Sequence, residues 1–144
     1  MKQLKDFLKV VEDHNKGELF EMVHGLSVRI LSALTELGDK EEAVKWYCTF
    51  ILTTLAADGR LADEEFLTVE PMFDAFFGNS FDYKTCKQLV KQVDDKSVVA
   101  AVVSVLNRMP SEIQSDMILA AIILCAIDGK ISAKEQAYIQ KLLD

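Results

Sequence analysis

Apolar residues recur at helical spacing along almost the whole of this 144-residue chain. In the first segment Leu4, Phe7, Leu8 and Val11 lie on one face of a helix. No segment alternates apolar and polar residues as a half-buried strand would. The pattern predicts an all-α fold, a single-domain bundle of about seven or eight helices over residues 1–144. The further helical segments expected are 19–37, 39–57, 63–77, 84–93, 97–108, 111–127 and one from residue 132 onward.

Three of these segments are unusually apolar. Residues 46–57 and 117–127 carry no charge, and residues 97–108 are apolar on every side. A helix without a polar face is typical of a buried position, so the sequence predicts that 97–108 is a central, buried helix. All three stretches are shorter than the ~20 apolar residues that span a membrane, so we expect no direct membrane insertion.

The chain also resembles itself at an offset of 70 residues, from residue 19 to residue 139 without a gap. Leu19 then corresponds to Leu89, and Val23 corresponds to Val93. Similar pairs continue through the two stretches, roughly 19–69 and 89–139. We interpret this as an internal repeat that predicts two halves related by a pseudo-two-fold axis. Neither half would close a hydrophobic core alone.

The most specific motif occurs once in each half, as TLAADGRLADEEF at 54–66 and LCAIDGKISAKEQ at 124–136. Each contains an Asp-Gly turn, at Asp58-Gly59 or at Asp128-Gly129. An apolar residue and a Glu follow the turn at the spacing found in the second half of an EF-hand calcium loop. The first and third ligand positions would be Thr54 and Ala56 in one copy, and Leu124 and Ala126 in the other. Because these residues cannot supply the missing carboxylates, neither motif is an EF-hand.

One interpretation of the two motifs is structural. Gly59 and Gly129 would each end a long buried helix, since glycine adopts the backbone conformation found there. Leu61 and Ile131 would pack each turn onto the core. Glu135 would form a capping box with Ser132. In the first copy Ala62 occupies the corresponding cap position and has no side-chain oxygen, so the cap explanation is weaker for Glu65.

The other interpretation is a metal site shared by the two turns. If the turns lie side by side at the pseudo-two-fold axis, their carboxylates meet. Oxygen ligands of this kind suit Ca²⁺ or Mg²⁺. The four candidate ligands are Asp58, Glu65, Asp128 and Glu135.

The two motifs resemble those of the TerB family of tellurite-resistance proteins, and the related N-terminal region of the DjlA co-chaperones. The matching stretches are AADGRLADEE at 56–65 and AIDGKISAKE at 126–135. The resemblance implies an all-α, two-fold helical domain with an acidic, metal-binding surface and an association with stress responses. No J-domain signature is present, because the chain contains no His-Pro-Asp, so the co-chaperone role does not carry over.

Composition narrows the class of protein. The net charge of −7, from 23 acidic and 16 basic residues, repels nucleic acid and favours a cation or a basic partner. Cys48, Cys86 and Cys125 form no C-x-x-C motif, and we expect a reducing, cytoplasmic compartment. No phosphate-binding glycine loop, G-x-S-x-G or H-E-x-x-H motif occurs, so we expect a protein that is not an enzyme.

The expected function is therefore that of a stress-linked, TerB-like interaction domain with a divalent-cation site at the Asp-Gly turns. The alternative is a structural interaction domain in which the turns are only helix caps. The candidate surface for a protein partner is Phe73, Phe76 and Phe77, which follow Pro71 and precede Gly78. Exposed aromatic residues of this kind mark partner sites, although at helical spacing they also fit a core.

Overall fold

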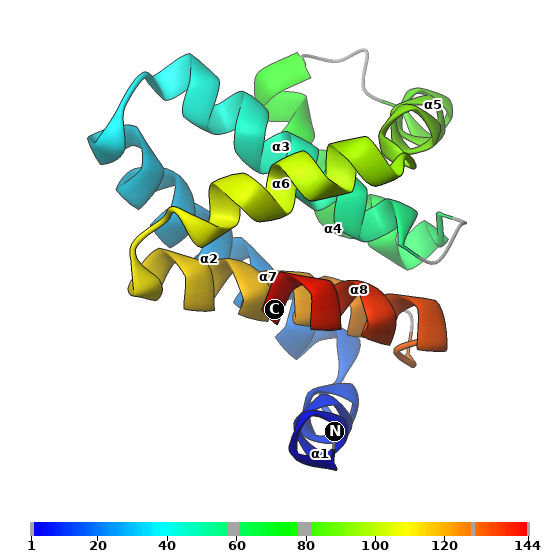
Figure 1. The fold of residues 1–144 in the computed structure, drawn as a ribbon. Helices are drawn as coiled ribbons and strands as arrows, with labels where there is room; N and C mark the ends of the chain where they lie inside the picture. Colours follow the sequence, from blue (N-terminus) through cyan, green and yellow to red (C-terminus); the bar gives the residue numbers. More distant parts are fainter. Residues whose placement is uncertain (1, 58–60, 78–81, 128, 144) are drawn as a thin grey trace.

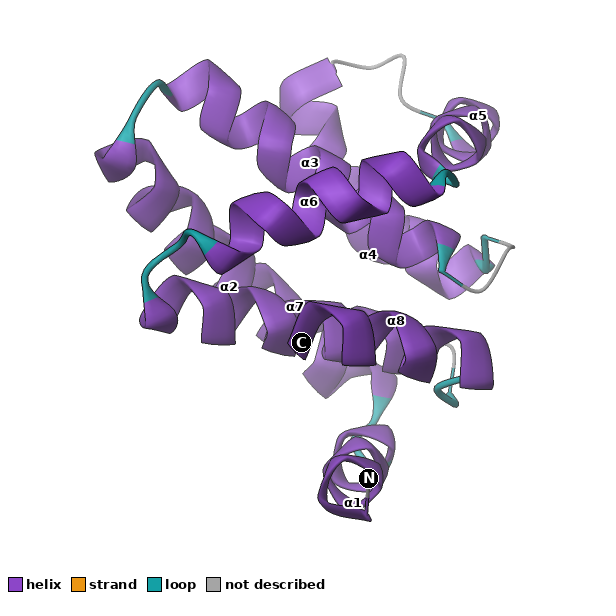
Figure 2. Ribbon diagram, viewed as in Figure 1, coloured by secondary structure: helices purple, strands orange, loops and turns teal. Residues whose placement is uncertain are grey.

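The computed structural model describes residues 2–57, 61–77, 82–127 and 129–143, with the side chains of residues 2, 3 and 75–77 left out. These residues form eight α-helices and no strand, which confirms the prediction of an all-α bundle (Figures 1 and 2). The helices are α1 (Lys2–Glu12), α2 (Lys16–Leu37), α3 (Lys40–Ala56), α4 (Asp63–Phe77), α5 (Tyr83–Val93), α6 (Lys96–Asn107), α7 (Ser111–Ala126) and α8 (Ala133–Leu143).

Short polar side chains begin several of the helices. Asn15 and Glu18 form a reciprocal capping box at the start of α2. Asp39 accepts a hydrogen bond from the Glu41 backbone N–H at 2.8 Å and starts α3. Asp95 accepts from the Ser97 backbone N–H at 2.7 Å and starts α6 directly after α5. Each cap contributes about 1 kcal/mol, and the cap at Asp95 fixes the point where the chain changes direction between α5 and α6.

Helices α3 and α7 form the centre of the bundle. Helix α7 contacts α1, α2, α3, α4 and α8, and α3 contacts α2, α5, α6 and α7. Residues 50–56 of α3 are all buried, as are residues 120–127 at the end of α7. These are the charge-free stretches of the sequence, which therefore mark the core correctly. No described helix is long and apolar enough to cross a membrane.

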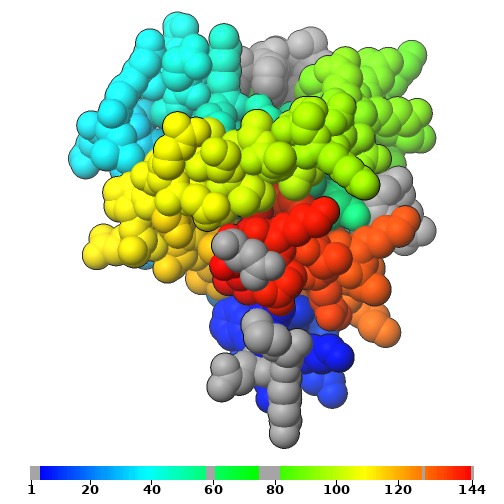
Figure 3. All heavy atoms as spheres, viewed as in Figure 1, coloured from blue at the N-terminus to red at the C-terminus, as the bar shows by residue number. Residues whose placement is uncertain are grey.

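The prediction that residues 97–108 form a central buried helix is wrong. Helix α6 lies on the surface, along the same face as α8 (Figure 3). Only Val102 and Leu106 of α6 are fully buried. The other valines are partly exposed, while Ala100 and Ala101 are exposed. Helices α3 and α7 fill the core, so α6 contacts it only through the stripe formed by Val102 and Leu106. The valines on either side of this stripe remain partly exposed.

Candidate functional site

The second Asp-Gly turn is fastened by hydrogen bonds from two directions. The Glu135 Oε1 atom accepts from the Ser132 backbone N–H at 2.9 Å, and Ser132 Oγ accepts from the Glu135 backbone N–H at 3.2 Å. This confirms the predicted capping box. From outside the motif, Glu12 at the end of α1 accepts from the Ile131 backbone N–H at 2.7 Å. The turn therefore joins α1, α7 and α8.

The first Asp-Gly turn has one of the two hydrogen bonds of this capping box. Glu65 Oε1 accepts a hydrogen bond from the Ala62 backbone N–H at 2.9 Å, just as Glu135 does from Ser132. The Tyr83 hydroxyl of α5 donates to the Leu61 carbonyl at 2.8 Å. A cap role for Glu65 thus needs no side-chain oxygen at Ala62, because the carboxylate itself satisfies a backbone donor at the helix start.

The remaining predicted residues of the turns are distributed as follows. Leu61 and Ile131 are buried, as predicted, and so are Glu65 and Glu135, at 2% and 1% exposure. Asp58, Gly59 and Asp128 lie outside the described residues. Among the residues that are described, no group of three or more His, Cys, Asp or Glu side chains could hold a metal ion. The Ca²⁺ or Mg²⁺ site therefore stays a prediction, and the observed bonds of both glutamates favour the cap interpretation.

Gly129 gives a prediction with an internal control. Its φ of +111° lies in a region that L side chains rarely adopt, and an added Cβ would meet nothing within 4 Å. Gly129→Ala should destabilise the protein through backbone strain alone, by about 1–3 kcal/mol. Gly25→Ala, in the exposed interior of α2 and equally free of contacts, should stabilise it by about 0.5–1 kcal/mol.

Urea denaturation of the two variants beside the wild type measures both effects. Changes of the same sign at the two glycines would contradict the assignment of strain to Gly129.

The aromatic partner surface is corrected by the structure at one of its three residues. Phe73 is 0% exposed and belongs to the core. Helix α4 continues through Pro71, which is on the exposed side, so the proline does not open a groove beside Phe73. The side chains of Phe76 and Phe77 lie outside the described residues.

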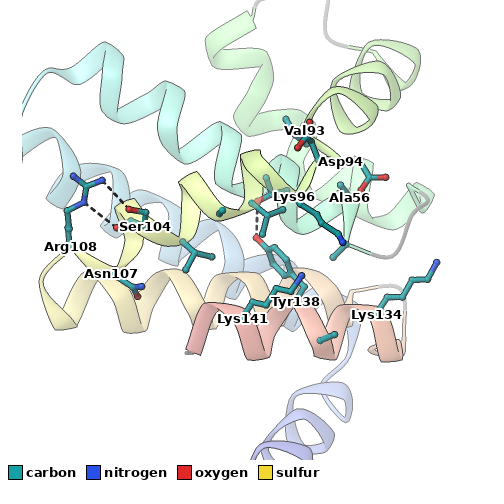
Figure 4. A pocket seen from close by; sticks show the side chains of 17 residues that line it. Ala56, Val93, Asp94, Lys96, Ser104, Asn107, Arg108, Lys134, Tyr138 and Lys141 are labelled. Atoms are coloured by element: carbon teal, nitrogen blue, oxygen red, sulfur yellow. Dashed lines mark hydrogen bonds between the residues drawn. The ribbon is translucent and has the colours of Figure 1, made fainter.

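The structure shows a different surface feature, a groove of about 1030 Å³ between α6 and α8 (Figure 4). Two stripes at helical spacing form its walls. One stripe, on α6, contains Lys96, Val99, Ala100, Val103, Ser104 and Asn107. The other, on α8, contains Lys134, Ala137, Tyr138 and Lys141. Thr53, Ala56 and Ala57 at the end of α3 line the floor.

Tyr138 anchors the floor of this groove to the core. Its hydroxyl lies 2.9 Å from Thr53 Oγ1 and 3.0 Å from Thr54 Oγ1, and both threonines also donate to the Phe50 carbonyl. Burial raises the pKa of Tyr138 to about 12, an effect that the hydrogen bonds to the two threonines partly oppose. The phenol is therefore protonated at neutral pH and contributes to structure, not to proton transfer.

The groove has the opposite charge to the protein as a whole. Lys96, Arg108, Lys134 and Lys141 line it together with Asp94 and Asp95, which gives a formal charge of +2 in a chain of −7. Within the described part of the chain, none of the four cations forms an ion pair. The net charge alone favours a basic partner, but it averages over the surface and misses this local excess of positive charge.

Sequence reasoning missed the groove although its parts have a pattern. On α6, Val99, Ala100, Val103 and Ser104 follow Lys96 at i+3, i+4, i+7 and i+8, and on α8 Ala137 and Tyr138 follow Lys134 at i+3 and i+4. Only the packing brings the two together. A scan against protein-family models found no match, and neither did searches of curated proteins and of solved structures.

Proposed function

We propose that this chain is a non-enzymatic protein-binding domain and that helix α6 is its binding surface. The observation that carries the proposal is the exposure of an apolar helix. A solvent-facing helix normally has a polar face, as α5 does with exposed Lys84, Lys87, Gln88 and Lys91. Helix α6 exposes Ala100 and Ala101 between polar residues, and four of its valines are partly exposed. Apolar surface left partly in water is typical of a site that a partner covers.

Apolar hollows on both sides of α6 support this proposal. The first is the α6–α8 groove. The second, of about 290 Å³, lies between α6 and α3 and is lined by Trp46, Val98, Ala101 and Val105 among others. Together they expose small and branched apolar side chains along the whole helix, which a partner could cover without reorganising the core.

We also propose that the domain is TerB-like and built from two repeated halves. Three helix boundaries support the offset of 70 residues. Helices α2 and α6 end at Leu37 and Asn107, α3 and α7 end at Ala56 and Ala126, and α4 and α8 begin at Asp63 and Ala133. One pair of contacts also follows the offset, because α2 contacts α7 and α6 contacts α3. In this scheme each half supplies helices that cover the central helix of the other half.

A catalytic role is not part of the proposal. Cys48, Cys86 and Cys125 are buried. Burial raises the pKa of the Cys48 and Cys86 thiols to about 12, so at neutral pH neither is the thiolate that a nucleophile requires.

The cation site is tested by thermal unfolding in chelator and then with added Ca²⁺ or Mg²⁺. If the turns are only caps, the melting temperature should not change at millimolar cation. A cation present at 100 times its dissociation constant would instead stabilise by about 2.7 kcal/mol, a rise of roughly 5–10 °C. Such a rise, absent from an Asp58→Asn/Asp128→Asn variant, would contradict the cap interpretation and restore the shared site.

The binding function is tested by placing a photo-crosslinking amino acid at Ala100, Ala101 or, as a control, Glu21. Ala100 faces the α6–α8 groove, Ala101 lines the hollow beside α3, and Glu21 is exposed on α2. In the source cells we expect discrete protein adducts from one or both α6 positions and none from Glu21. Equal adduct yields at all three positions would contradict the proposal.

A further inference from the structure

The α6–α8 groove has the length and lining of a groove that binds a third helix. Helices α6 and α8 run in the same direction along its two sides (Figure 1). Their lining residues follow the i, i+3, i+4, i+7 spacing along both walls. Helix α6 has 12 residues and is therefore ~18 Å long, enough for three turns of a bound helix. The small side chains of Ala100, Ser104 and Ala137 would let another helix approach closely.

The charges lie where they could contact the flanks of such a helix. Lys96 begins the α6 wall and Arg108 ends it, while Lys134 and Lys141 occupy the two ends of the α8 stripe. In Figure 4 the side chains of Lys96 and Lys141 extend into the space between the two helices. Between these ends the lining is mainly apolar and small. The groove thus combines an apolar base with a cationic end at Arg108 and Lys141. At the other end, Lys96 and Lys134 line it together with Asp94 and Asp95.

The proposed repeat compares this groove with one bond in the first half. At an offset of 70 residues His24 corresponds to Asp94 and Thr68 corresponds to Tyr138. In the first half His24 Nε2 lies 2.9 Å from the Thr68 carbonyl and joins α2 to α4. In the second half α6 begins only at Lys96, and Asp94 and Tyr138 both line the groove.

We propose that the α6–α8 groove binds an amphipathic helix of a partner protein, with small apolar residues on its inner face and carboxylates on its flanks. The inference rests on the proposed binding function and names the chemistry of the partner. In helix-in-groove recognition the bound helix places apolar anchors at i, i+3, i+4 and i+7 against an apolar groove. Charge complementarity selects acidic flanks over basic ones and raises the rate of association.

The test uses a fluorescein-labelled peptide of about 14 residues, which spans ~21 Å as a helix. It has Leu and Ala at i, i+3, i+4 and i+7 and Glu on both flanks. A peptide with Lys in place of Glu, and a scrambled peptide of the same composition, serve as controls. In fluorescence anisotropy, only the Glu peptide should bind. Raising NaCl from about 0.05 to about 0.5 M should weaken its binding, because the attraction is screened.

Matched variants locate the site. Lys134→Glu/Lys141→Glu and Ala137→Trp change exposed groove residues, and each should weaken binding at least about ten-fold. Ala101→Trp, on the other side of α6, should change it by less than about two-fold. Circular dichroism checks that each variant is folded. Because the lysines are exposed, their reversal tests the groove even if the tryptophan variant does not fold.

Three results would overturn the inference: no binding of the Glu peptide, equal binding of the Lys and Glu peptides, or no effect of Lys134→Glu/Lys141→Glu. Binding of laurate in place of the Glu peptide would make the groove a site for a small amphiphile. If the Glu peptide fails while adducts still form at Ala101, only this inference is lost. If adducts fail at both α6 positions as well, the proposed binding function is lost too.

Discussion

Phe50→Ala is expected to lower the free energy of unfolding by about 3–5 kcal/mol. Phe50 is 0% exposed in the middle of α3, one of the two central helices. Its ring stacks with those of Trp46 and Tyr47, at centroid distances of 6.1 and 6.2 Å. Truncation removes this apolar contact and leaves a cavity that the surrounding helices fill only in part.

Urea denaturation followed by circular dichroism measures this change, with Phe7→Ala as the matched control. Phe7 is 44% exposed on α1, so its truncation should have an effect of less than about 1 kcal/mol. Similar losses for the two variants would contradict the placement of Phe50 in the core.

The second large effect is unfolding at alkaline pH. Burial raises the pKa of the Cys48 and Cys86 thiols from 9.0 to about 12. Burial likewise raises the pKa of the Tyr47 and Tyr138 phenols from 10.0 to about 12. Because the folded-state pKa values lie above the unfolded ones, the unfolded chain loses these protons first. The associated stability is complete below pH 9 and is lost as the pH rises towards 12.

The loss should be large because the four groups act in the same direction. Each unit of pKa difference corresponds to about 1.4 kcal/mol, so even one of these groups is a sizeable part of the ~5–15 kcal/mol that stabilises a typical domain. Urea midpoints measured from pH 7 to pH 12 should be flat to about pH 9 and then fall steeply. The double variant Cys48→Ala/Cys86→Ala should make the fall between pH 9 and pH 10 shallower, because two of the buried thiols are gone. A flat profile to pH 12 would contradict the burial of these groups.

The helices themselves were largely predictable, because the signals for them are local. The charge-free stretches at 46–57 and 117–127 lie in the mostly buried parts of α3 and α7, with residues 57 and 127 just past the ends of these helices. The Ser132–Glu135 capping box and the positive φ of Gly129 follow from residues within a few positions of each other. Interactions of this range depend on backbone geometry alone, so the sequence is sufficient to identify them.

The bonds that fasten the Asp-Gly turns could not be predicted in the same way. Glu12 and Ile131 are separated by 119 positions in the sequence, and no local pattern links them. Tyr83 likewise reaches the Leu61 carbonyl from the start of α5. The motif correctly predicted that Glu135 caps the start of α8. It did not indicate which distant helix would form a further hydrogen bond to the turn.

The sequence by itself therefore determined that the chain is all-α, how far its central helices extend, and which residues cap the second Asp-Gly turn. It also predicted that no helix would insert in a membrane, and no described helix could span one. Only the tertiary structure decided that α6 lies on the surface, that Phe73 is buried and that α6 and α8 form a cationic groove. Periodicity shows which faces of a helix are apolar. Which of those faces is covered depends on how the other helices pack. Helices α3 and α7 occupy the core, so α6 packs against it from outside.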